Sequence, residues 1–164
     1  MPMTDLEPKL LDETFRDYAW NYFQLHADQR IKVFQFYVTL STALIGGFLL
    51  ALRQGFNNKW IAILGILLTF VSFIFWRLDQ RTKQLVKNAE EALKLLDAQY
   101  DLPDINGAPH PLRIMSRDDY MTTHLKTGWL WNGHFSYSRC FHWIFITFSL
   151  TGVGASLASL LFSF

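Results

Sequence analysis

Few side chains in this sequence could take part in catalysis. The first candidates are an arginine and a histidine late in the chain. Arg117 and His124 enclose six residues in the segment RDDYMTTH. A guanidinium binds phosphate oxygens through a planar fork, and an imidazole can exchange protons near neutral pH. Together they could cleave a phosphodiester bond. The alternative is a capped surface helix that carries an ordinary arginine and histidine.

The spacing of Arg117 and His124 matches the loose pattern of HEPN-type ribonucleases, in which the pairs of two subunits converge on a scissile phosphate. So loose a pattern also arises by chance, which leaves a nuclease as a minor alternative. The five histidines show no pair at metal-ligand spacing, and Cys140, the single cysteine, supplies neither a disulfide nor a thiolate site. We therefore expect no catalytic residue, metal or cofactor.

The elements that must position these side chains are dominated by three apolar segments. Residues 33–52, 60–76 and 140–164 contain no Asp, Glu, Lys or Arg, and about 20 such residues cross a bilayer. Trp60 and Trp76 bracket the second segment, where indole rings favour the two interfaces. The sequence predicts an all-α membrane protein with three transmembrane helices. A soluble bundle with very apolar helices is the alternative.

The remaining segments are charged and helical in pattern. Phe15, Tyr18, Tyr22 and Leu25 recur on one face of an N-terminal amphipathic helix. No Gly or Pro follows the second span until residue 103, so that span continues as a charged helix. The expected organisation is an amphipathic helix (1–30), a transmembrane hairpin (31–76), a helical segment with a loop (77–139) and a third transmembrane helix (140–164).

Lysines and arginines near the ends of the spans indicate the orientation. They gather before the first span, after the second and before the third, whereas the hairpin has two and the C-terminus none. Because basic residues are retained on the cytoplasmic side, we expect the N-terminus and residues 77–139 in the cytoplasm. The C-terminus would be periplasmic, in a bacterial inner membrane. The net charge of +1 gives no reason to expect direct nucleic-acid binding.

Each span carries small or polar residues at helical spacing on one face. They are Gln35, Thr39, Thr42 and Gly46 in the first; Ala62, Gly65, Thr69 and Ser72 in the second; and His142, Ser149, Gly152, Ser156, Ser159 and Ser163 in the third. Such stripes let helices pack closely, or they line a water-filled pathway built by several subunits. We expect the third stripe to line a pathway if one exists, with the first as runner-up.

Three stretches resemble small membrane proteins of bacterial anti-phage operons. These stretches are WNYFQLHADQRIKVFQFYVTLSTALIGG, FWRLDQRTKQLVKNAEEALK and SYSRCFHWIF. The proteins include effectors of retron and cyclic-nucleotide-signalling systems and membrane accessories of RNA-targeting CRISPR systems. The resemblance implies a homo-oligomer that forms or gates a pore in the lipid bilayer and depolarises the cell when a cytosolic partner senses infection. A passive membrane anchor for such a partner is the alternative.

Overall fold

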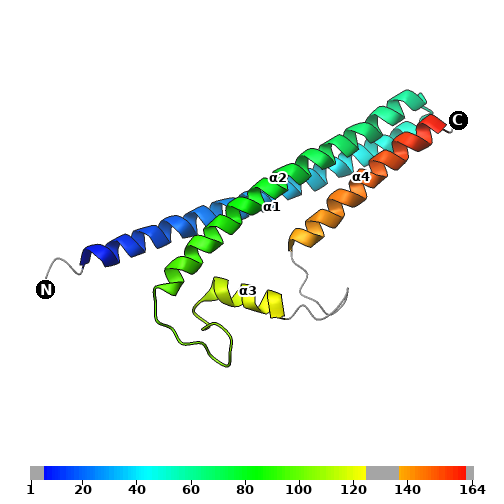
Figure 1. Ribbon diagram of the computed structural model, residues 1–164. Helices are drawn as coiled ribbons and strands as arrows, with labels where there is room; N and C mark the ends of the chain where they lie inside the picture. The colour runs from blue at the N-terminus through cyan, green and yellow to red at the C-terminus, as the bar shows by residue number, and fades with distance from the viewer. Residues whose placement is uncertain (1–5, 125–136, 162–164) are drawn as a thin grey trace. The chain divides into compact units, whose positions relative to one another are not determined.

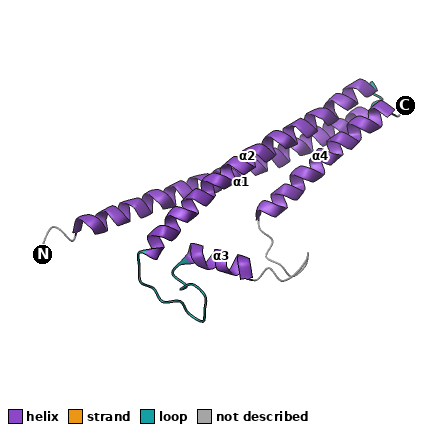
Figure 2. Cartoon of the chain, in the orientation of Figure 1, coloured by secondary structure: helices purple, strands orange, loops and turns teal. Residues whose placement is uncertain are grey.

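Helices form most of the computed structural model, which describes residues 6–124 and 137–161. In chain order they are α1 (Leu6–Arg53), α2 (Asn58–Ala98), α3 (Ile114–His124) and α4 (Tyr137–Leu161). Within the described residues, extended pairing is limited to one isolated bridge between Ile105 and Ala108, and Figure 2 draws no strand. The predicted all-α fold is confirmed.

The helices are divided between two compact units. One, here the apolar unit, comprises Gln29–Lys83 and Ser136–Phe164; the other, here the charged unit, comprises Met1–Asp28 and Gln84–Phe135. Both α1 and α2 therefore contribute residues to each unit, α3 belongs to the charged unit and α4 to the apolar unit. The second span does continue into a charged helix, as the sequence predicts.

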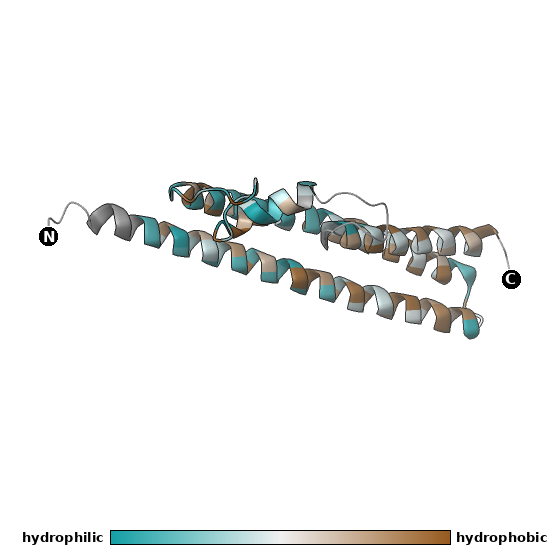
Figure 3. Ribbon diagram, turned by 90° about the horizontal axis from the view of Figure 1, so that it is seen from below, coloured by the Kyte–Doolittle hydropathy of each residue, from teal (hydrophilic) through white to brown (hydrophobic). Residues whose placement is uncertain are grey.

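Three helices are long and apolar enough to cross a membrane: Asp12–Arg53, Asn58–Ala98 and Ser138–Leu161. Hydrophobic residues predominate along their apolar-unit portions in Figure 3. A short turn joins the first two. Gly55 adopts φ 65° there, a conformation that costs glycine little, and Asn57 Oδ1 accepts a hydrogen bond from the Lys59 amide at 3.0 Å. Asn57 thus caps the start of α2.

Aromatic rings form the core of the apolar unit, where α1, α2 and α4 run side by side (Figure 1). Tyr37, Phe141 and Phe145 are buried. Phe34 of α1 stacks on Phe141 of α4 with ring centroids 3.8 Å apart. The Tyr37 hydroxyl lies 2.9 Å from Ser72 Oγ of α2. All three membrane helices therefore meet within one described unit.

Ion pairs and a tyrosine hydrogen bond connect the helices of the charged unit. Arg16 of α1 binds Asp97 of α2 at 3.2 Å, and the Tyr100 hydroxyl donates to Asp12 at 2.8 Å. Lys94 of α2 binds Asp119, which attaches α3. The N-terminal part of α1 therefore packs on the charged part of α2.

Candidate functional site

The stripes of the second and third spans pack directly on each other. A Cβ atom added to Gly65 would lie 2.6 Å from the Gly152 carbonyl oxygen, and one added to Gly152 would lie 2.6 Å from the Gly65 oxygen. No real side chain tolerates such distances. The two backbones are therefore in contact, which is the usual role of small residues between membrane helices.

Hydroxyl groups reinforce this contact between α2 and α4. Thr69 Oγ1 lies 3.0 Å from the Gly65 oxygen on its own helix and 3.3 Å from the Ser149 oxygen on α4. Ser156 Oγ lies 2.9 Å from the Gly152 oxygen on its own helix and 3.1 Å from the Ala62 oxygen on α2. Each hydroxyl has one proton, so it alternates between or shares the two acceptors.

Other members of these two stripes have partners as well. Ser159, which is buried, donates to the Ser156 oxygen at 2.9 Å. Ser72 is buried and bonded to Tyr37. The Trp76 indole donates to His142 Nε2 at 3.0 Å, so His142 carries its proton on Nδ1 when neutral. Ser163 lies outside the described residues.

A buried ion pair near the end of the apolar unit was not anticipated from the sequence. Arg30 of α1 donates to both carboxylate oxygens of Asp79 on α2, at 2.7 and 3.2 Å. The side chains are 13% and 5% exposed. The same guanidinium donates to Ser138 Oγ of α4 at 3.1 Å and lies 5.1 Å from the Phe141 ring centroid. One arginine therefore joins all three membrane helices.

The stripe of the first span has a different environment from the other two. Gln35, Thr39, Thr42 and Gly46 are all exposed. Thr39 Oγ1 donates only to the Gln35 carbonyl of its own helix, at 3.0 Å, and a Cβ at Gly46 would meet nothing within 4 Å. In the apolar unit, α1 packs instead through the buried side chains of Tyr37, Ser41 and Ala51. The stripe is thus uncovered by the described chain.

A fourth stripe, on α4, escaped the sequence reasoning. Thr147, Thr151, Gly154 and Ala158 are exposed and share the same helical spacing. The two hydroxyls donate to carbonyls of their own helix, at 2.8 and 2.9 Å. The spacing of this stripe is visible in the sequence, but the serine stripe on the other face of α4 is more polar and longer.

The pair considered for phosphodiester cleavage lies on α3. Arg117 is half-buried and donates to the Pro109 carbonyl oxygen at 3.2 Å. His124 stacks on Tyr120 with ring centroids 3.9 Å apart, and its Nδ1 lies 3.0 Å from the Tyr120 oxygen. Both side chains have local structural partners on or beside α3. No group of three His, Cys, Asp or Glu in the described residues could hold a metal ion.

Two titratable groups of the charged unit have shifted acidities. The Lys94 ammonium, which donates to Asp119, lowers the pKa of that carboxyl below its ordinary value of 3.8. The hydrogen bond from Tyr100 to Asp12 raises the pKa of the Tyr100 hydroxyl above its ordinary value of 10.0. Both groups are therefore in their ordinary charge states at neutral pH, which suits a structural role.

Comparison with known proteins decides the family. The model of the Octameric membrane protein family (8xMP) matches residues 15–162. The chain belongs to this family. It is also 34% identical over 143 residues to CD-NTase-associated protein 19 of Escherichia coli. The aligned region covers 84% of this chain and 85% of that protein. No solved structure matches the chain.

Membership of this family bears on how the stripes are interpreted. The resemblance to small membrane proteins of bacterial defence systems is confirmed, and the chain is a membrane protein of a family described as oligomeric. An isolated copy leaves the stripes of α1 and of the outer face of α4 uncovered. In a membrane oligomer such surfaces meet other copies, water or lipid.

Proposed function

We propose that eight copies of this chain form a ring in the bacterial inner membrane, and that α1 lines a pathway through it. The ring size comes from the description of the family. The observation that carries the lining is the uncovered polar stripe of Gln35, Thr39, Thr42 and Gly46. The stripes of α2 and α4 that face each other are occupied by their mutual packing.

Gln35 gives the strongest physical support to this choice. Its amide is exposed on an apolar helix, and the described contacts include no partner for it. A primary amide without a partner in hydrocarbon costs several kcal/mol. A threonine avoids much of that cost by bonding to its own helix, as Thr39 does. Gln35 needs water or a neighbouring subunit, and a water-filled pathway supplies the first.

The size and charge of the pathway follow from the helix geometry. Eight helices of about 10 Å diameter, standing side by side in a ring, enclose an opening of about 16 Å. No charged residue occurs between positions 33 and 52. At the two ends of the same face, Lys32 and Arg53 are exposed. The pathway would pass hydrated ions with low selectivity and with a modest preference for anions.

In this proposal the pathway acts in defence against phage. The related protein of Escherichia coli is associated, by its name, with a CD-NTase. With the N-terminus and the charged unit in the cytoplasm and the C-terminus in the periplasm, a cytosolic sensor or other defence-system partner can reach the charged unit. Opening would dissipate the membrane potential of an infected cell. This proposal requires no enzymatic step and assigns no catalytic role to Arg117 and His124.

A matched pair of substitutions tests the lining. Thr39→Leu and Thr151→Leu each remove an exposed hydroxyl that bonds to its own helix, at 3.0 and 2.9 Å. In cells that express the protein with its genomic neighbours, a voltage-sensitive dye reports the membrane potential after phage challenge. We expect Thr39→Leu to slow the loss of potential measurably, because eight leucine side chains narrow the opening and replace the hydroxyls that line it.

Thr151→Leu should leave the depolarisation intact, since its side chain lies on another helix. Both variants are first shown to keep the native particle mass in detergent. If the wild-type protein protects the cells while their potential stays unchanged, conduction is refuted and a passive anchor is favoured. If Thr39→Leu depolarises as the wild type does, α1 does not line the pathway.

A further inference from the structure

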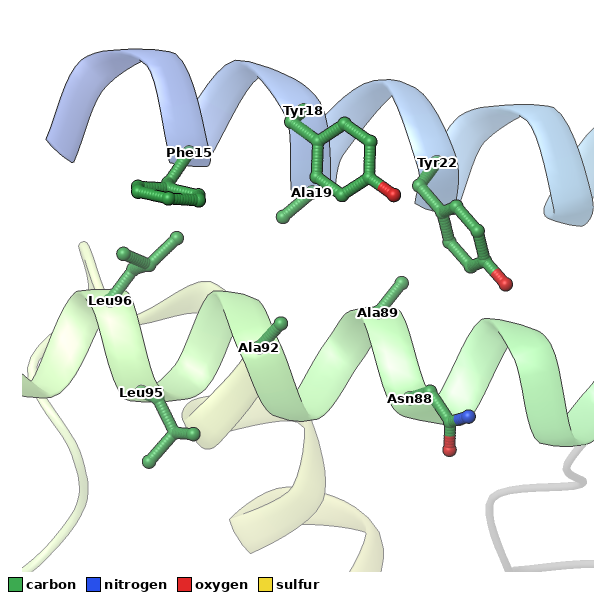
Figure 4. A pocket seen from close by; sticks show the side chains of 9 residues that line it. All are labelled: Phe15, Tyr18, Ala19, Tyr22, Asn88, Ala89, Ala92, Leu95 and Leu96. Carbon is green, nitrogen blue, oxygen red and sulfur yellow. The ribbon is translucent and has the colours of Figure 1, made fainter. Parts of the chain in front are cut away.

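The charged unit contains an apolar groove between α1 and α2. Its volume is about 510 Å³, and the described residues leave it open. Figure 4 shows Ala89 and Ala92 on its α2 side, across from Phe15, Tyr18 and Ala19 of α1. Because the alanine side chains are small, they leave space between α2 and the aromatic side chains of α1. Tyr18 is 66% exposed, and Leu95, which also lines the groove, is 71% exposed.

A second apolar patch belongs to the same unit. It consists of Leu112 and Ile114, which are 69% and 68% exposed and stand at the start of α3. Lys94 binds α3 through Asp119, whereas Ala92 lines the groove. Two positions along a helix differ by about 200° around its axis. The helix that carries the patch therefore docks on α2 on the side away from Ala92.

Symmetry explains why one chain would carry two such surfaces. Copies inserted in a membrane with the same orientation can be related only by rotation about the membrane normal. A ring of this kind has head-to-tail contacts, in which one surface of each copy meets a different surface of the next. For eight copies the rotation is about 45° per subunit, which suits two surfaces on roughly opposite sides.

We propose that the groove of one copy receives Leu112 and Ile114 of the next copy around the ring. The occupant is a second copy because the family is described as octameric and because the chain itself offers an exposed apolar patch of matching character. Burial of both surfaces also removes from water several of the most exposed large apolar side chains of the charged unit. This inference rests on the assembly that the proposed function includes.

Disulfide cross-linking of the full chain tests the contact. Cys140 is replaced by serine, and Ala92→Cys is combined with Ile114→Cys. Disulfides form only between Cα atoms within about 7 Å. Because Ala92 lies on the side of α2 away from α3, oxidation should link different copies. We expect a ladder of covalent species that extends beyond the dimer toward eight copies on a non-reducing gel.

The matched control pairs Asp17→Cys with Ile114→Cys. Asp17 is exposed on α1 but does not line the groove, so no ladder should form. A ladder that stops at the dimer, or strong dimers from Ala92→Cys alone, would mean that like surfaces meet and would overturn the inference. So would equal ladders from the control pair.

A second variant measures assembly directly. Ala92→Glu places a charge on the α2 side of the groove, and we expect the particle mass in detergent to fall from eight copies toward one while the helical circular dichroism is kept. An unchanged octamer overturns the contact and leaves the proposed ring intact. If the wild-type particle is itself a monomer or dimer, both the ring and this contact are refuted.

Discussion

The buried ion pair gives the sharpest prediction about stability. Asp79→Asn keeps the shape of the side chain and removes its charge. Arg30 then loses the carboxylate that accepts two of its hydrogen bonds, at 2.7 and 3.2 Å. Its remaining neighbours are Ser138 Oγ at 3.1 Å and the Phe141 ring. Neither neutralises the guanidinium, so a cation is left without a counter-charge.

Burial sets the magnitude of this effect. The side chains of Arg30 and Asp79 are 13% and 5% exposed, so water replaces little of what is lost. Removing one partner of a buried pair costs about 3–5 kcal/mol. Asparagine still accepts one hydrogen bond, which places the expected loss near the lower limit. Glu90→Gln is the control: Glu90 pairs with Lys87, which is 50% exposed, and such a pair contributes about 0.3–0.5 kcal/mol.

Titration with sodium dodecyl sulfate from mild-detergent micelles, followed by tryptophan fluorescence, measures the free energy of unfolding. The double variant Arg30→Met, Asp79→Leu should recover most of the loss, because apolar residues of similar volume often replace a buried pair at little cost. The reasoning is refuted if Asp79→Asn costs no more than Glu90→Gln. It is also refuted if the double variant loses as much stability as Arg30→Met alone and Asp79→Leu alone lose when added together.

Three further predictions concern packing, conduction and acidity. Gly65→Ala should cost about 1–3 kcal/mol in the same titration, because its Cβ would lie 2.6 Å from a carbonyl, whereas Gly47→Ala, with nothing within 4 Å, should cost far less. Arg53→Gln should shift the reversal potential of reconstituted channels under a salt gradient away from anion preference. The pKa of Asp119 is lowered in the folded protein, so this carboxylate stabilises the docking of α3 above pH 3.8 and loses that contribution as the pH falls through the folded pKa. The rate of hydrogen exchange in α3 should therefore rise at low pH. The rise should be smaller in Lys94→Met, which lacks the partner of Asp119.

The helices were predictable from the sequence because their determinants are local. The charge-free segments, the bracketing tryptophans and the turn residues around Gly55 all act within a few positions of each other. The continuation of α2 into the charged unit follows from the lack of a helix breaker before residue 103. These features need no knowledge of which helix lies beside which.

The contacts between helices were harder to predict, because periodicity identifies a face and leaves its partner open. Asp79 follows the second span among several charged residues, and only its pairing with Arg30, 49 positions earlier, distinguishes it from them. Tyr37 and Ser41 are buried, yet they lie on the face of α1 opposite the stripe that composition favours. The sequence shows the stripe of Gln35 more clearly than the side on which α1 actually packs.

Similar stripes can therefore have different roles, and the difference lies in what covers them. The glycines and hydroxyls of α2 and the inner face of α4 are used where two backbones touch. The residues on α1 have the same types and spacing but face away from the chain. A membrane supplies no hydrophobic force that would press such a face against lipid or protein. Thr39 is satisfied by a carbonyl of its own helix, but the side-chain amide of Gln35, whose described contacts include no partner, needs another copy or water, and we propose water.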